Sequence, residues 1–119
     1  MSNMIKSNIF EIERPWGRFR QFTHNELSTI KIITVLPNEI LSLQSHKKRE
    51  EFWHIISGSG WVEIDGAKTP VKVGDEYEIK IGEKHRMSAG GEGMQVLEIA
   101  TGDFDELDIV HFEDKYGRI

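Results

Sequence analysis

Four side chains in two short segments have the types and spacing of a metal-binding site. Gln44 and His46 lie two residues apart, Glu51 follows five residues later, and His85 lies in the second segment. Alternate residues of a strand project from one face, so Gln44 and His46 can point at one centre. Two imidazoles, a carboxylate and an amide oxygen suit a divalent first-row ion with one position left open. The sequence therefore predicts a metal site at these four residues.

Each histidine taken alone has a simpler explanation. His46 precedes the charged run Lys47–Arg49, which is typical of a solvated loop, and His85 follows Gly82 as a turn residue would. Motifs of one residue match by chance often. The joint spacing of both histidines, the carboxylate and several glycines favours the metal site over the loop interpretation.

The composition is that of one globular domain. The chain has 119 residues, of which 38% are hydrophobic and 29% charged, with 15 basic and 20 acidic side chains and a net charge of −5. Such a charge balance argues against nucleic acid as a partner. The chain has no cysteine, no apolar run of about 20 residues and no hydrophobic signal core. We expect a cytoplasmic protein that binds neither nucleic acid nor a membrane.

Short β-branched and apolar runs separated by turn residues predict an all-β sandwich or barrel. Asp65-Gly66 is the strongest hairpin signal in the chain. The strands are expected at residues 30–36, 41–45, 52–56, 61–64, 70–73, 77–81, 94–100 and 109–112. Residues 1–12 read as an N-terminal arm with a short apolar patch, and residues 13–119 as the domain.

Residues 38–58 and 74–89 resemble the two motifs of the cupin superfamily, whose members are double-stranded β-helix (jelly-roll) barrels. The matching residues are His46, Glu51, Gly58, Gly74, Gly82 and His85. The superfamily usually has His where this chain has Gln44, Pro at the position of Lys80 and Asn at that of Ala89. The resemblance implies a single all-β cupin domain that binds a metal ion.

A closer resemblance, from Arg14 onward, is to the type II mannose-6-phosphate isomerase cupin. The segments that carry it are Arg14–Gly17, Leu41–Gln44, Phe52–Trp53, Ser57–Gly58, Lys84–Arg86, Asp108–Val110 and Glu113–Arg118. Where this chain has His46-Lys47-Lys48, that family commonly has a run of histidines. That family often carries a mannose-1-phosphate guanylyltransferase domain ahead of the cupin, and we expect no such domain within these 119 residues. The resemblance implies a metal-dependent isomerase that interconverts mannose 6-phosphate and fructose 6-phosphate.

The residues also suggest which ion and which base such an enzyme would use. Gln44 replaces an imidazole by a harder oxygen ligand, which favours Zn, Mn or Fe over Cu and Ni. Glu98 is our candidate for the general base, because a carboxylate amid Val96, Leu97 and Ile99 is uncommon without a role. Strand alternation leaves open whether Glu98 faces the interior or the solvent. The resemblance favours the interior.

A sugar phosphate also needs a cation for its phosphate group. The candidates are Arg14, Lys48, Arg49, Lys84, Arg86 and Arg118. Arg86 is preferred because it directly follows His85 and because arginine makes bidentate phosphate contacts. At least two of the three residues in Lys47–Arg49 are expected to belong to a solvated loop.

Two other functions remain open from the sequence. One is a metal-binding cupin that recognises a sugar or small acid without converting it, and the other is an iron-dependent cupin oxygenase. We also expect a homodimer formed through sheet edges, with the N-terminal arm crossing to the partner.

Overall fold

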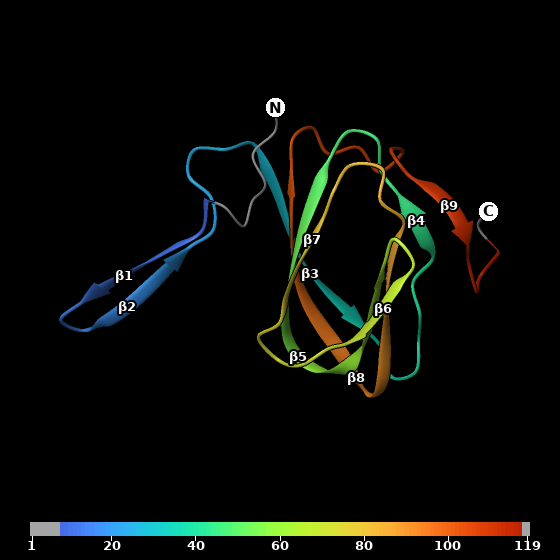
Figure 1. Cartoon of the computed structure of the whole chain (residues 1–119), viewed down its shortest axis with the longest axis horizontal. Coiled ribbons are helices and arrows are strands. Elements are labelled where there is room, and N and C mark those ends of the chain that lie inside the picture. Colours follow the sequence, from blue (N-terminus) through green and yellow to red (C-terminus); the bar gives the residue numbers. More distant parts are fainter. Residues whose placement is uncertain (1–7, 118–119) are drawn as a thin grey trace.

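The computed structural model describes residues 8–117, so the first seven residues of the expected arm lie outside the described part. The described residues form β1 (Phe10–Arg14), β2 (Gly17–Gln21), β3 (Ser28–Val35), β4 (Leu43–Ser45), β5 (Glu50–Ile64), β6 (Ala67–Pro70), β7 (Glu76–Ile79), β8 (His85–Thr101) and β9 (Val110–Glu113) (Figure 1). Within this range no helix is long and apolar enough to cross a membrane. The expected all-β class is confirmed.

The long strands β5 and β8 are the centre of the fold. They pair antiparallel from Glu50 opposite Thr101 to Ile64 opposite His85. β7 joins the first half of β5 and β6 joins its second half, while β3 and β4 pair with opposite ends of β8. β9 extends the sheet beyond β4. The curled sheet encloses the interior seen in Figure 1.

The sequence predicts two strands, 52–56 and 61–64, where the structure has the single strand β5. The glycines between them mark β-bulges, with register shifts between Ile55 and Ser57 and between Gly58 and Gly60. Gly58 has a φ of +89°, and a Cβ atom there would collide with the carbonyl oxygen of Gly93. Glycine here permits a close approach of two backbones rather than ending a strand.

Strand alternation decides which side chains enter the interior. On β5, Trp53 and Ile55 belong to the apolar core together with Val62 and, from β8, Val96. His54 projects to the opposite face, where its Nδ1 lies 2.7 Å from a carboxylate oxygen of Glu76. The period of two read from the sequence therefore holds over the first part of β5, and the bulges shift it before Val62.

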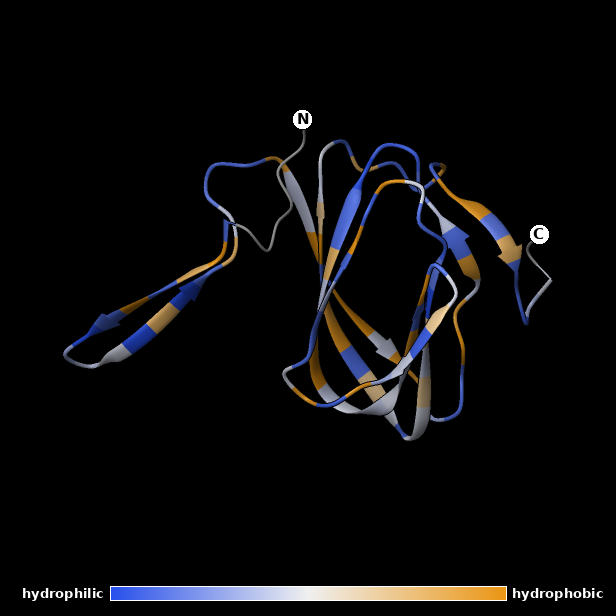
Figure 2. Ribbon diagram, viewed as in Figure 1, coloured by the Kyte–Doolittle hydropathy of each residue, from blue (hydrophilic) through white to orange (hydrophobic). Residues whose placement is uncertain are grey.

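The hairpin formed by β1 and β2 projects away from the rest of the molecule (Figure 1). Among the described residues these two strands pair only with each other. Phe10, Ile12 and Phe19 share one face of the hairpin by register, and Figure 2 shows the alternating apolar bands along it. At its base, the guanidinium of Arg20 forms a two-pronged ion pair with Glu76 on β7.

Candidate metal centre

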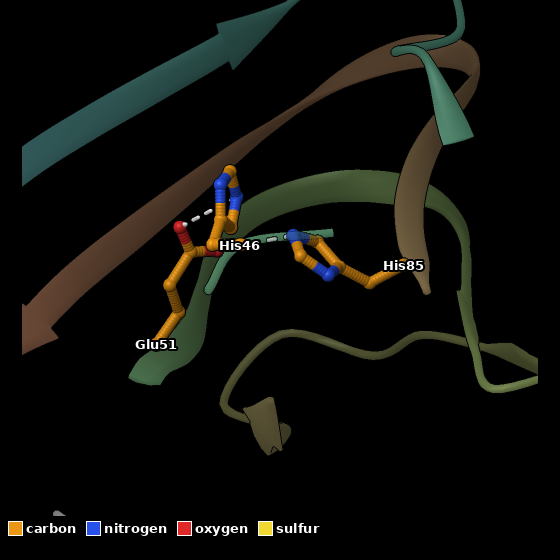
Figure 3. Close-up of side chains that lie close together, drawn as sticks. All are labelled: His46, Glu51 and His85. Atoms are coloured by element: carbon orange, nitrogen blue, oxygen red, sulfur yellow. Dashed lines mark ion pairs between the residues drawn. The ribbon is translucent and has the colours of Figure 1, made fainter. Parts of the chain in front are cut away.

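His46, Glu51 and His85 converge from three separate segments (Figure 3). Glu51 lies near the start of β5, His85 begins β8, and His46 directly follows β4. One ligand atom from each of the three side chains lies within 4.8 Å of the other two. Nε2 of His46 is 3.3 Å from Oε2 of Glu51, and Nε2 of His85 is 3.4 Å from Oε1 of the same carboxylate. The structure thus brings together three of the four predicted ligands.

Both imidazoles are oriented by backbone carbonyl groups. Nδ1 of His46 lies 2.6 Å from the carbonyl oxygen of Asp108, and Nδ1 of His85 lies 2.8 Å from that of Glu83. A carbonyl oxygen only accepts, so each Nδ1 carries the proton and donates it. The lone pair of each ring is therefore on Nε2, the atom that faces the carboxylate. Metal-ligating histidines are commonly fixed in this way.

Burial keeps the two histidines neutral. Burial lowers the pKa of His85 to about 4, and it also lowers the pKa of His46 below its ordinary value. A metal ion binds the neutral form of imidazole. Two neutral imidazoles and a buried carboxylate form a donor set that fits a divalent ion.

Gln44, the fourth predicted ligand, lies on β4 directly opposite His85, and such cross-strand partners share a face. The Gln44 amide nitrogen lies 3.2 Å from Oγ of Ser42 and 3.4 Å from the carbonyl oxygen of Ser42. Because this carbonyl needs a donor, the contact assigns the nitrogen of the amide to Ser42 and leaves the Gln44 oxygen for another partner. This position is compatible with metal ligation, and the ligand role of Gln44 stays a prediction.

Glu98 projects into the interior, beside Glu51. Strand alternation alone could not decide between the interior and the solvent for this side chain. Nε1 of Trp53 donates to both carboxylates, at 3.3 Å from Oε1 of Glu51 and 3.2 Å from Oε1 of Glu98. Burial, followed by the negative charge of Glu51 and a hydrogen bond to it, raises the pKa of Glu98 to about 7. A carboxyl group with such a pKa can take up and release protons near neutral pH.

Arg86 is not brought together with these residues. It follows His85 on β8, so its side chain leaves from the other face of the strand. There it forms an ion pair with Glu113 on β9. A phosphate group bound by Arg86 would have to compete with this carboxylate, and the role of Arg86 stays a prediction.

The structure adds contacts that the sequence interpretation missed. Arg49, which the sequence offered only as a candidate for phosphate binding, is buried and contacts both His46 and Glu51; its position two residues before Glu51 was an available signal. Asp108 accepts the backbone N–H groups of Lys47 and Lys48 at 2.8 and 2.9 Å. It lies about 60 residues away in the chain, and no local pattern indicates such a contact.

His111 is a further residue whose contacts the sequence did not predict. It lies opposite Gln44 on β9, and its Nδ1 is 2.9 Å from Oγ of Ser42. Ser42 therefore links the side chains of Gln44 and His111, and the polar row His85, Gln44 and His111 crosses three neighbouring strands.

Comparisons with known proteins agree with this geometry. The family model described as "Mannose-6-phosphate isomerase C-terminal" matches residues 3–114. The chain is 34% identical over 111 residues to the mannose-1-phosphate guanylyltransferase ManC of Salmonella typhimurium, a match that covers 92% of this chain and 23% of that protein. The chain thus spans about a quarter of the length of this relative.

Solved structures show the same fold. A cupin protein from Bacteroides fragilis is 25% identical, with a TM-score of 0.58, and the match covers 68% of this chain and 74% of that one. A Klebsiella pneumoniae protein with a double-stranded β-helix domain superposes with a TM-score of 0.64 at 20% identity, covering 76% and 78% of the two chains. The fold is the cupin double-stranded β-helix, and the buried triad His46, Glu51 and His85 is typical of a cupin metal site. Because that family model matches almost the whole length of this chain, the chain belongs to the mannose-6-phosphate isomerase C-terminal domain family.

Proposed function

We propose that this chain is a metal-dependent aldose–ketose isomerase that interconverts mannose 6-phosphate and fructose 6-phosphate. The observation that carries the proposal is the pairing of a metal-type triad with a second buried carboxyl group, Glu98, beside it. The family match supports the choice of substrate.

His46, Glu51 and His85 would hold the ion, with Gln44 as a fourth ligand. When bound, a divalent ion such as Zn, Mn or Fe polarises the oxygen atoms on C1 and C2 of the sugar. Glu51 then carries the negative charge of the ligand set, and the two neutral histidines leave the site with a net positive charge for the substrate oxygens.

Glu98 would move the proton. In its ionised form it would remove the proton from C2 of the open-chain sugar, and the C2–H electron pair would form the C1–C2 double bond of an enediol as the C1 carbonyl pair moves to O1. It would then return the proton to C1, while the hydroxyl proton passes from O2 to O1 and C2 becomes the carbonyl carbon, so the reaction balances without a further reactant. A pKa of about 7 suits both halves of this cycle, because the ideal base has a pKa near the working pH. Trp53 keeps the carboxyl group of Glu98 in place through its indole N–H.

The phosphate group of the substrate requires a cation at the edge of the site. Arg86 remains our candidate, with its ion pair to Glu113 as the competitor for that phosphate. Lys47 and Lys48 are exposed and directly follow His46 in the chain, so they are alternatives for this role.

The test is an assay of the purified protein reconstituted separately with Zn, Mn and Fe(II). Formation of fructose 6-phosphate from mannose 6-phosphate is followed by a coupled assay, and loss of the C2 proton to D₂O by NMR. Glucose 6-phosphate, which differs only at C2, is the matched control for substrate choice. We expect conversion and exchange with mannose 6-phosphate. Metal binding without C2 exchange under any of the three ions would instead favour a non-catalytic sugar-binding cupin.

A further inference from the structure

The guanidinium group of Arg49 contacts two of the three side chains of the triad, Glu51 and His46. The Arg49 side chain is 7% exposed, and its Nε donates to Oε2 of Glu51 at 2.9 Å. Its Nη2 is 3.2 Å from Nε2 of His46, and its Nη1 donates to the carbonyl oxygen of Asp105 at 3.2 Å. The ring of Phe104 lies 4.2 Å from the guanidinium carbon. All three nitrogens are therefore engaged.

The contact with His46 uses the same lone pair that a metal ion needs. Nδ1 of His46 donates to Asp108, so Nε2 holds the only lone pair available for bonding in the ring plane. Nη2 of Arg49 can only donate, and it therefore donates to this lone pair. A hydrogen bond and a coordinate bond cannot share it.

The contact with Glu51 does not create the same conflict. The carboxylate has two oxygens, and Arg49 binds Oε2, whereas Oε1 is the oxygen nearest to His85. Arg49 can keep this hydrogen bond while Oε1 coordinates an ion. The conflict is thus confined to one contact, between Arg49 and His46.

We propose that Arg49 competes with the metal ion for His46, so that ion binding requires the guanidinium to turn away from Nε2. This inference rests on the proposed metal site. Arginine keeps its charge in proteins, so loss of a proton cannot remove this competition for His46. A fixed positive charge a few ångströms from a divalent ion further disfavours the ion. Arg49 is then a positioning residue that orients Glu51 and limits the affinity of the site.

The test compares the affinity for Zn²⁺ and Mn²⁺, measured by calorimetry, in the wild type and in Arg49→Met. Methionine keeps much of the buried volume but removes the charge and the donors. We expect the affinity to rise about 10-fold or more, because the variant removes both the donor that occupies Nε2 of His46 and a fixed positive charge beside the ion. Lys48→Met is the matched control: it removes the same charge from an exposed neighbour and should change the affinity much less.

Thermal unfolding provides a second measurement. Without added metal, Arg49→Met should unfold at a lower temperature than the wild type, because Glu51 loses a buried partner; with metal, its unfolding temperature should rise by more. Arg49→Gln, which is too short to reach His46, repeats the comparison if the methionine variant does not fold. The proposal is overturned if Arg49→Met binds the metal no more tightly than Lys48→Met, or more weakly than the wild type. It is also overturned if no variant binds metal. None of these results depends on isomerase activity, which the assay above tests separately.

Discussion

The two histidines of the site differ from exposed histidines in their protonation. An ordinary histidine has a pKa of about 6.5, whereas burial lowers that of His85 to about 4 and that of His46 in the same direction. The folded protein therefore keeps both imidazole rings neutral, with a lone pair on Nε2, at pH values where exposed imidazoles are protonated. Protons compete with a metal ion for these atoms only when the pH falls towards the lowered values.

We accordingly expect the protein to keep its metal as the pH falls through about 6.5, where an ordinary imidazole takes up a proton, and to lose it as the pH approaches the lowered pKa of His85, about 4. The measurement is metal analysis after dialysis at a series of pH values, with circular dichroism as the control for unfolding. Half-loss of metal near pH 6.5 in the folded protein would contradict the lowered pKa of both histidines.

The two buried carboxyl groups, Glu51 and Glu98, should respond differently to the same substitution. Glu51→Gln removes the charged ligand, so metal and activity should be lost together. Glu98→Gln keeps the shape but cannot accept a proton, so the metal should remain while turnover falls by ~100- to 10,000-fold. Metal analysis and the coupled assay on both variants separate these outcomes. Full activity in metal-loaded Glu98→Gln would exclude Glu98 as the base.

At the scale of the elements, the site depends on β5 and β8 remaining paired through their bulges. The first half of β5 carries Glu51, and β8 carries both His85 and Glu98 at positions 13 residues apart. The register shifts between Ile55 and Ser57 and between Gly58 and Gly60 lie between these positions. In a regular strand, residues 13 apart point to opposite faces, so this irregularity allows His85 and Glu98 both to be buried.

Gly58→Ala tests this element, because the new methyl group would meet the carbonyl oxygen of Gly93. Gly66→Ala is the matched control: φ is +88° there and +89° at Gly58, but nothing lies within 4 Å of a Cβ at Gly66. Both variants should lose about 1 kcal/mol or more from the left-handed backbone. Gly58→Ala should lower the melting temperature at least twice as much as Gly66→Ala. Equal decreases would show that the close approach of Gly58 to Gly93 does not affect stability.

At the scale of the whole molecule, the β1–β2 hairpin is an element that contact with a second copy of the chain would stabilise. A two-stranded hairpin is marginally stable on its own in water, and Trp16 at its tip is 73% exposed. The outer face of β3 also presents Ile30 and Ile32, which are 59% and 63% exposed. Among the described residues β3 pairs only with β8, so its other edge is open. These surfaces support the homodimer that we propose, in which the expected arm, residues 1–12, crosses to the second copy together with the hairpin that it leads into.

We expect sedimentation at micromolar concentration to show a dimer that Ile32→Lys converts to a monomer, because a charge would be buried in the interface. Val73→Lys is the control, since Val73 is 64% exposed and lies in the turn between β6 and β7. A wild type that sediments as a monomer, or equal effects of the two lysines, would show that the interface lies elsewhere or does not form.

The sequence by itself determined the all-β class, the ligand types and the alternation of β5. These are local properties: Asp65-Gly66 favours a tight turn wherever it occurs, and Glu51, Trp53 and Ile55 share a strand face because the side-chain period is two. The match of whole segments to a known family added the expected barrel, and the structure confirms it.

The tertiary structure alone decided the face of Glu98, the burial of Arg49 and the contacts of Asp108. Glu98 is placed by pairing with Trp53 from a distant strand, and Asp108 reaches the loop after His46 across more than half the chain. Such contacts depend on how strands pair and curl in space, and short-range patterns carry no information about them. The sequence therefore predicted the candidate ligands, whereas the fold decided which charged groups surround them.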